Sequence, residues 1–142
     1  MQALLGDNFI TREGEFSFSE LEENQVICLY FSANWCPPCR IFTPVLVEFY
    51  NDVNYPDKRL EIIQVSSDKD ESSFNEYISQ LPWAAIPYGD PRNKALKSRF
   101  KITGIPILLL LNRDGSLAYG KARADVQNEG PPCFERWVDL VS

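Results

Sequence analysis

The most informative absence in this sequence of 142 residues is histidine, which does not occur at all. Nucleophiles activated by histidine, whether cysteine or serine, are therefore excluded, and so are zinc sites that mix cysteine and histidine ligands. Any base or proton donor in this chain must be a carboxyl group, a tyrosine, a lysine or water.

Long apolar runs and an excess of positive charge are also missing. The longest apolar run, residues 105–111, is far shorter than the roughly 20 residues of a membrane-spanning helix. The first residues, MQALLGDNF, do not show the basic and apolar segments of a secretory signal, so we expect a cytoplasmic protein with no membrane partner. A net charge of -6 argues against nucleic acid as a partner.

The composition that is present is that of an ordinary globular protein. Hydrophobic residues make up 44% of the chain and charged residues 24%, which is typical of folded domains. A chain of this length buries a core that needs no disulfide bonds. We therefore expect residues 1–142 to form a single domain, and we expect it to be a monomer.

The first third of the chain predicts a hairpin, a short helix and a buried strand. Short alternating runs around Gly14 favour a hairpin over residues 8–18. Ser19 and Glu22 have the spacing of a capping box, which would open a short helix. The apolar run VICLYF, residues 26–31, is typical of a strand that is buried on both faces.

Helical and strand patterns alternate along the rest of the chain. A helix is expected after CPPC, with an apolar face formed by Ile41, Val45, Leu46, Phe49 and Tyr50. Strands are expected at 60–65, 105–111 and 116–121, and helices at 67–80, 91–100 and from 131 onward. Helices between parallel strands imply right-handed crossovers. The predicted fold class is α/β: a central mixed sheet flanked by helices, with an N-terminal β-hairpin extension.

The stretch FSANWCPPCRIF contains two closely spaced cysteines, Cys36 and Cys39. A zinc site would need all four cysteines of the chain, but Cys28 lies inside an apolar strand and no second close pair exists. A disulfide across so short a loop restrains the unfolded chain little. Redox chemistry of the pair is the remaining interpretation, and it requires neither a metal ion nor another cofactor.

The position of the pair supports that interpretation. If Cys36 is the N-cap of the following helix, its sulfur faces unpaired amides and the positive end of the helix dipole, which favour a thiolate. Pro37 and Pro38 have no amide hydrogen, so the best placed donor is the amide of Cys39. Cys36 can then attack a substrate disulfide, and Cys39 can resolve the mixed disulfide that results.

The dipeptide Ile105-Pro106 is a second feature with two interpretations. A proline at the start of a buried strand can have a trans peptide bond, which is the commoner case, or a cis bond that orients an exposed backbone edge. The local sequence alone favours trans.

Several motifs occur in order along the chain: WCPPCR after an aromatic-rich strand, then FTPVLVEFY, VSSD, LPWAAIPY and GIPILLLLNRDG. With these motifs the sequence resembles the tryparedoxin and nucleoredoxin branch of the thioredoxin-like proteins, from about Phe9 to Arg123. The resemblance implies a thioredoxin fold, with Cys36 as the exposed nucleophile and Cys39 as the resolving cysteine. It also implies that Trp35 shields the site, that Pro106 is cis, and that the backbone at Ile105 pairs with a substrate chain.

Tyr30 stands where thioredoxins have a buried aspartate, as it does in this branch. A neutral tyrosine is no base near pH 7, so removal of the Cys39 proton relies on water or a more distant carboxyl group. Arg40 and Arg123 either hold an acidic group of a thiol substrate or are simply solvated.

The resemblance implies a dithiol–disulfide oxidoreductase that passes electrons from a low-molecular-weight thiol or a reductase to protein disulfides, such as those of peroxiredoxins. A redox-regulated binding module of the nucleoredoxin type is the alternative. An isomerase or oxidase of secreted proteins is disfavoured by the absence of a signal and by the C-terminal sequence DLVS.

Other residues have a plain structural interpretation beside a functional one. Cys28 and Trp83 are expected to fill the core, whereas Cys133 is either an additional redox site or an inert thiol. The helix that carries Arg92, Lys94, Lys97, Arg99 and Lys101 is basic in an acidic protein. It forms either a solvated face or a docking surface for an acidic partner.

Overall fold

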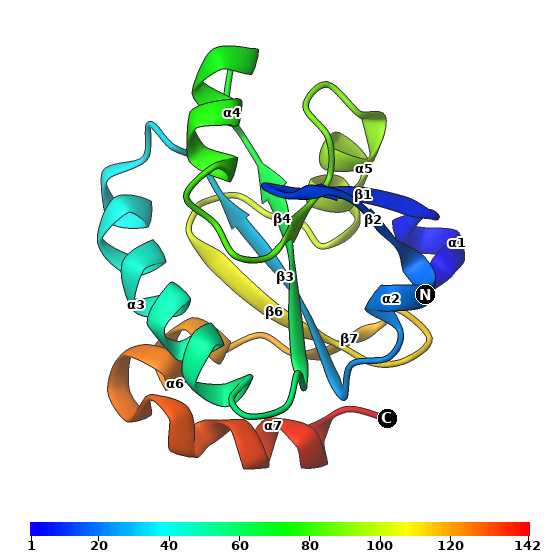
Figure 1. Cartoon of the computed structure of the whole chain (residues 1–142), viewed down its shortest axis with the longest axis vertical. Coiled ribbons are helices and arrows are strands. Elements are labelled where there is room, and N and C mark those ends of the chain that lie inside the picture. Colours follow the sequence, from blue (N-terminus) through cyan, green and yellow to red (C-terminus); the bar gives the residue numbers. More distant parts are fainter.

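The computed structural model describes all residues from 1 to 142, and a seven-stranded sheet runs through its centre (Figure 1). The strands are β1 (Asn8–Thr11), β2 (Gly14–Ser17), β3 (Val26–Ser32), β4 (Leu60–Ser66), β5 (Ala84–Ala85), β6 (Ile107–Leu111) and β7 (Leu117–Tyr119). Their order in the sheet is β2-β1-β5-β4-β3-β6-β7. β4 is parallel to β3 and β5, and all other neighbours are antiparallel. The predicted mixed sheet and N-terminal hairpin are confirmed.

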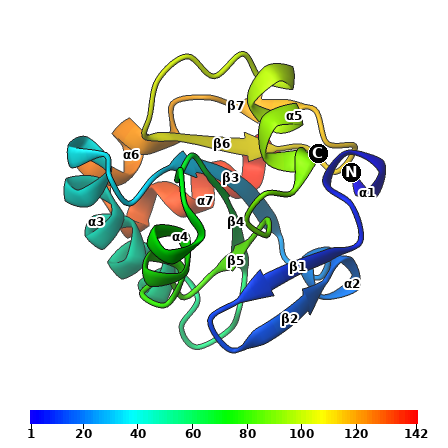
Figure 2. The ribbon, with the colours of Figure 1, turned by 90° about the horizontal axis from the view of Figure 1, so that it is seen from above.

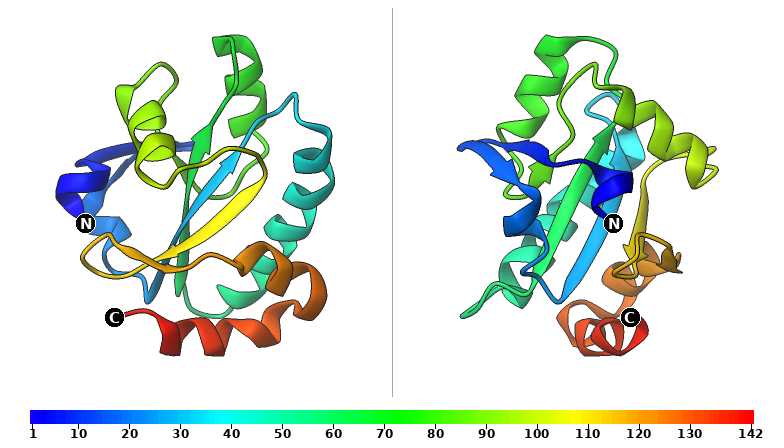
Figure 3. Two further views of the ribbon diagram at one scale, coloured as in Figure 1. Left: turned by 180° about the vertical axis from the view of Figure 1, so that it is seen from behind. Right: turned by 90° about the vertical axis from the view of Figure 1, so that its right-hand side faces the viewer.

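Helices cover both faces of this sheet (Figures 2 and 3). They are α1 (Gln2–Leu5), α2 (Phe18–Leu21), α3 (Pro37–Val53), α4 (Glu71–Ile78), α5 (Pro91–Arg99), α6 (Ala122–Glu129) and α7 (Phe134–Leu140), with the 3₁₀ turn η1 (Pro131–Cys133) before α7. α3, α4, α6 and α7 contribute to the core on one face, and α1, α2 and α5 to the core on the other. None of these helices has both the length and the apolar character needed to cross a membrane.

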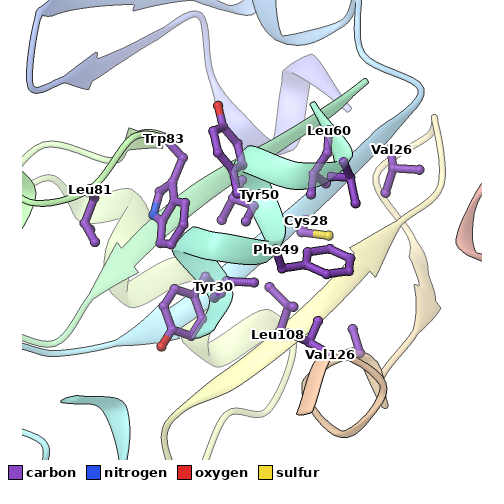
Figure 4. Packing of buried hydrophobic residues seen from close by; sticks show 14 of the residues in the cluster. Val26, Cys28, Tyr30, Phe49, Tyr50, Leu60, Leu81, Trp83, Leu108 and Val126 are labelled. Atoms are coloured by element: carbon purple, nitrogen blue, oxygen red, sulfur yellow. The ribbon is translucent and has the colours of Figure 1, made fainter. Parts of the chain in front are cut away.

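β3 is buried along its whole length because alternate side chains enter different cores. Cys28 and Tyr30 point into the larger core, under α3, as Figure 4 shows. In that core the ring of Trp83 meets Tyr30 and Tyr50 edge to face, with centroid distances of 5.9 and 5.6 Å. The expectation that Trp83 and Cys28 fill the core is confirmed.

The capping box of the short helix α2 was predicted two residues too late. Ser17, and not Ser19, is the N-cap, and its side chain accepts a hydrogen bond from the amide of Glu20. The carboxylate of Glu20, in place of Glu22, accepts from the amide of Ser17 at 2.8 Å. Both pairs have the same spacing, but β2 ends at Ser17, so the helix begins immediately after that residue.

The sheet-facing side of α3 was predicted only in part. Leu46, Phe49 and Tyr50 are buried as expected. Ile41 and Val45, however, are 73% and 42% exposed, so the prediction was wrong for these two. The buried stripe runs at a spacing of three or four residues from Cys39, through Phe42, Thr43, Leu46 and Phe49.

Three further boundaries differ from the expectation. α4 begins at Glu71, because the side chain of Asp70 accepts from the amide of Ser73 and caps the helix there. β6 begins at Ile107, after the proline, and β7 covers only Leu117–Tyr119. α6 was not predicted, because only Ala122, Asp125 and Val126 of its eight residues are buried and the apolar pattern is weak.

Candidate active site

Cys36 is the N-cap residue of α3, as the sequence predicts. Its sulfur accepts a hydrogen bond from the amide of Cys39 at 3.3 Å. Pro37 and Pro38 form the first helical turn and have no amide hydrogen to offer. The Cys39 amide and the N-terminal end of a 17-residue helix therefore both face this sulfur.

The exposure of Cys36 differs from the expectation of an exposed nucleophile. Only 3% of the residue is exposed, because Ala33 and Cys39 pack around it and Ile105 lies against all three. The neighbouring Trp35, in contrast, is 48% exposed. The residue before this buried cysteine thus has a large ring that is half exposed.

Cys39 is completely buried in the first turn of α3. Burial raises the pKa of its thiol to about 12, and the hydrogen bond and charge of Cys36 act in the same direction. The backbone of Ala33 and the positive charge of Arg123 act in the opposite direction, toward a lower pKa. Cys39 is therefore a protonated thiol at neutral pH, in contact with a sulfur at a helix terminus that favours negative charge.

The loop before β6 brings Ile105 and Pro106 against Cys36. The peptide bond between these two residues is cis, as the resemblance implies and contrary to the local expectation. The carbonyl oxygen of Ile105 accepts a hydrogen bond from the Cys36 thiol at 3.9 Å, and Pro106 is buried. A backbone segment thus lies directly beside the sulfur at which a substrate would react.

Trp35 and Arg40 are held by backbone carbonyl groups. The indole nitrogen of Trp35 donates to the carbonyl oxygen of Ser67 at 3.0 Å, and the ammonium group of Lys69 lies 5.3 Å from the centroid of the ring. The Nε of Arg40 donates to the carbonyl oxygen of Asn34 at 2.6 Å. Arg40 therefore stabilises the loop between β3 and α3.

Asp68 is a residue of this region to which the sequence analysis assigned no role. One carboxylate oxygen accepts from the amide of Asn34 at 2.8 Å, and the other accepts from the hydroxyl of Ser66 at 2.5 Å. This residue ties the β3–α3 loop to the β4–α4 loop. Its only sequence signal is its place in the motif VSSD.

Tyr30 belongs to a chain of buried hydroxyl groups. Its hydroxyl lies 2.7 Å from that of Thr43, which lies 2.9 Å from the hydroxyl of Tyr77, and Tyr77 reaches Ser32 at 2.8 Å. Gln64 continues the chain from Ser32 to the indole of Trp83. Burial raises the pKa of both tyrosines, so they are neutral near pH 7. This series of hydrogen-bonded side chains contains no carboxyl group that could accept a proton from Cys39.

Arg123, near the start of α6, lies on the other side of Pro106. Its Nη1 donates to the carbonyl oxygen of Pro106 at 3.3 Å, and its guanidinium carbon lies 5.7 Å from the centroid of Phe42. The buried Nε has no hydrogen-bond partner. Pro106, Lys121 and Arg123 line an open hollow of about 470 Å³. Of the two arginines considered from the sequence, Arg123 is the one whose charge acts on the Cys39 thiol.

The other two cysteines lie in the large core, away from the N-terminus of α3. Both are completely buried, and burial raises the pKa of each thiol, to about 12 for Cys133. Protonated and inaccessible thiols are unreactive. No three His, Cys, Asp or Glu side chains gather in a way that would hold a metal ion.

Comparison with known proteins agrees with this geometry. The sequence model of the thioredoxin-like family matches residues 24–117. Probable nucleoredoxin 1 from Arabidopsis thaliana is 46% identical over 110 residues, which are 78% of this chain and 19% of that protein. A tryparedoxin from Trypanosoma brucei brucei is 40% identical over 122 residues, which are 84% of this chain and 83% of that protein. The chain thus spans about a fifth of the nucleoredoxin but most of the tryparedoxin.

Solved structures give the same result. Tryparedoxin from Trypanosoma brucei superposes with a TM-score of 0.84 at 35% identity, covering 94% of this chain and 92% of that one. A tryparedoxin II in complex with glutathionylspermidine superposes with a TM-score of 0.83 at 28% identity, covering 93% of both chains. With a matching family model, a CPPC motif at the start of α3 and a cis proline beside it, the chain belongs to the thioredoxin-like family.

Proposed function

We propose that this chain is a dithiol–disulfide oxidoreductase that reduces protein disulfides through Cys36 and Cys39. The observation that supports this function best is the contrast between the two thiols. One sulfur accepts a hydrogen bond at a helix N-terminus, and the other thiol is buried behind it with a pKa of about 12. This arrangement suits Cys36 to attack the substrate disulfide and Cys39 to remain protonated until the mixed disulfide has formed.

The reaction proceeds by two exchanges. The Cys36 thiolate attacks one sulfur of the substrate disulfide; a mixed disulfide forms, and the other substrate sulfur leaves as a thiolate that takes a proton from solvent. Cys39 then loses its proton and attacks the sulfur of Cys36, which releases the second substrate thiolate. The substrate has gained two electrons, and the chain holds a Cys36–Cys39 disulfide. A thiol reductant restores the dithiol by the reverse steps.

The residues around the pair have supporting roles in this proposal. The backbone at Ile105 pairs with the substrate chain beside Cys36, and Pro106 orients that edge. Arg123 favours the thiolate of Cys39, because its positive charge lowers the pKa of that thiol. It also offers a cation to an acidic group of a small thiol, and Trp35 covers the outer side of the site.

For the reductant we propose a low-molecular-weight thiol, and for the protein substrate a disulfide such as that of a peroxiredoxin. The first proposal is supported by the related tryparedoxin II, whose structure contains glutathionylspermidine. The cationic Arg123 beside an open hollow is the feature of this chain that fits the carboxylates of such a thiol.

Insulin reduction by the purified chain, with dithiothreitol as the reductant, tests this function. Cys36→Ser is expected to abolish turnover, whereas Cys39→Ser is expected to accumulate mixed disulfides that mass spectrometry detects. Cys133→Ser serves as the matched control, because its thiol is buried in the core and plays no part in the reaction. Turnover by Cys36→Ser would refute the assignment of the nucleophile.

A redox-regulated binding module is the second candidate. It is supported by the nucleoredoxin relative, of which this chain covers only 19%, so that the homologous segment there is part of a larger protein. The two candidates predict different results. A binding module shows slow insulin reduction together with partner capture that depends on whether the pair is oxidised, whereas a reductase turns over many times.

A further inference from the structure

A second, polar hollow lies beside the candidate active site. It has a volume of about 490 Å³ and is lined by residues of the β4–α4 loop, the β5–α5 loop and α5, among them Ser67, Asp68, Tyr88, Asn93, Lys94 and Lys97. α4 and α5 stand at the end of the sheet where α3 begins, as Figure 1 shows. Ser67 belongs to this hollow and to the active site at once, because its carbonyl oxygen accepts from the indole of Trp35.

Lys97 is a half-buried cation in this hollow without an acidic partner. Its ammonium group donates to the hydroxyl of Ser67 at 2.8 Å, and it takes part in none of the ion pairs of the molecule. Burial lowers the pKa of Lys97. A cation in this position is stabilised when an anion enters the hollow.

The carboxylates in the hollow do not form an ion pair with Lys97. Both oxygens of Asp68 are engaged by the amide of Asn34 and the hydroxyl of Ser66. Asp90 caps α5 and forms an ion pair with Arg92 at 3.0 Å. Asp90 therefore already has a cationic partner, and the oxygens of Asp68 already accept hydrogen bonds from neutral groups of the adjoining loops.

The basic helix predicted from the sequence thus divides into residues with different roles. Arg92 is bound to Asp90 and to the carbonyl oxygens of Leu5 and Asn8. Lys94 and Lys97 line the hollow, whereas Lys101 lies beyond the end of α5 and does not. In a chain with a net charge of -6, Lys94 and Lys97 are two cations in this hollow that take part in no ion pair.

We propose that this hollow binds the carboxylate side chain of an aspartate or glutamate that lies close in sequence to the reactive cysteine of a protein substrate. The proposal rests on the proposed function and adds a preference for acidic substrates to it. Contacts lead from Cys36 to its neighbour Trp35, from there to Ser67, and from Ser67 to Lys97. A ligand that contacts both Cys36 and Lys97 must span the indole ring of Trp35 and the peptide unit of Ser67. An extended polypeptide is long enough to do so.

The test uses peptides that contain one cysteine, joined by a disulfide bond to uncharged 2-mercaptoethanol. In one series a single glutamate occupies successive positions on either side of the cysteine, and in the matched series glutamine replaces it. The full chain reduces each peptide with dithiothreitol as the reductant, and kcat/KM is measured at low ionic strength. Each rate is divided by the same variant's rate with 2-hydroxyethyl disulfide, which has no charge.

The expected result is a preference for glutamate over glutamine of about fivefold at one position or two neighbouring positions, the size of a partly exposed ion pair. Lys97→Gln is expected to abolish the preference, and Lys97→Arg to keep most of it. Lys101→Gln removes a positive charge outside the hollow, and we expect this variant to keep the full preference for glutamate. Rising salt concentration weakens the preference.

Two results would overturn the proposal: no position at which glutamate is preferred, or a preference that survives in Lys97→Gln. If in the second case Lys97→Gln also changes the KM for glutathione, the hollow serves a small thiol instead. If the wild-type chain fails to reduce even 2-hydroxyethyl disulfide, the proposed function itself is wrong, and this proposal falls with it.

Discussion

The hydroxyl of Tyr30 lies 2.7 Å from the hydroxyl of Thr43, inside the core and on the side of β3 that faces α3. A thioredoxin-like chain with a carboxylate at position 30 would place a charge there. This chain places a neutral hydrogen bond there instead, so the interior next to Cys39 is polar but uncharged.

Tyr30→Phe removes this hydroxyl and leaves Thr43 with Tyr77 as a hydrogen-bond partner. We expect the free energy of unfolding to fall by about 1 kcal/mol, which is typical of one buried hydrogen bond. Urea denaturation measures this change. The pH dependence of insulin reduction is expected to stay the same, because no titrating group is lost below pH 9. A shifted pH profile would show that Tyr30 takes part in proton transfer.

The resolving step should accelerate with pH. The pKa of Cys39 is raised to about 12, so below that value its thiolate fraction grows about tenfold for each pH unit. Part of the shift comes from Cys36 and is lost once Cys36 is in a mixed disulfide, so the pKa of Cys39 is then lower. Rapid-quench mass spectrometry of the mixed disulfide between pH 6 and 8 measures the rate. A rate independent of pH would contradict a buried, protonated Cys39.

Arg123→Gln should slow the same step. Its guanidinium group lowers the pKa of Cys39, so its removal raises that pKa and reduces the thiolate fraction at neutral pH. We expect the mixed disulfide to persist about two to ten times longer, which corresponds to a pKa change of up to about one unit. Lys121→Gln is the matched control, because Lys121 lines the same hollow. Equal effects of both variants would indicate a general charge effect.

Glu61 connects protein stability to pH at a place outside the Cys36–Cys39 site. The residue is 2% exposed, and burial raises the pKa of its carboxyl group above the usual 4.5, despite an ion pair with Lys58 at 2.8 Å. A raised folded-state pKa means that the folded chain binds the proton more tightly, so stability falls as pH rises above about 4.5. Wild type should therefore lose stability relative to Glu61→Gln between pH 4.5 and 7 in urea titrations. Glu13→Gln, at an exposed position, should show no such trend.

The two sides of α3 should respond differently to truncation. Phe42→Ala removes a completely buried ring, and we expect a loss of about 3–5 kcal/mol in the free energy of unfolding. Ile41→Ala, one residue earlier, removes a side chain that is 73% exposed and should change stability by less than about 0.5 kcal/mol. Thermal and urea unfolding of both variants test this. Similar losses would mean that Ile41 is covered in solution.

The parts of this molecule that follow from local chemistry were predictable from the sequence. The all-apolar run of β3 predicts a strand buried on both faces, and Pro37 and Pro38 after Cys36 predict the N-cap geometry that the structure contains. Both depend on neighbours within a few residues. The mixed sheet follows from the order of such elements.

Features that depend on distant contacts were not predictable in this way. The exposure of Ile41 depends on where α3 lies on the sheet, and α6 has too few buried residues to form a pattern. The same applies to Lys97, whose significance comes from Ser67 and from the acidic side chains that are already paired around it. A run of basic residues shows charge, but only the fold shows which of the charges lack a partner.

The cysteine motif and α3 form a continuous segment, yet the difference between the two thiols does not belong to that segment. Cys39 loses contact with water because the sheet and the loop at Ile105 cover it, and the charge that acts on it comes from Arg123, 84 positions further along the chain. A synthetic fragment of residues 34–53 would contain both sulfurs and the helix end. In that fragment Cys39 would be hydrated and would titrate like an ordinary thiol, so the division of labour that we propose between an attacking and a resolving cysteine depends on the assembled fold.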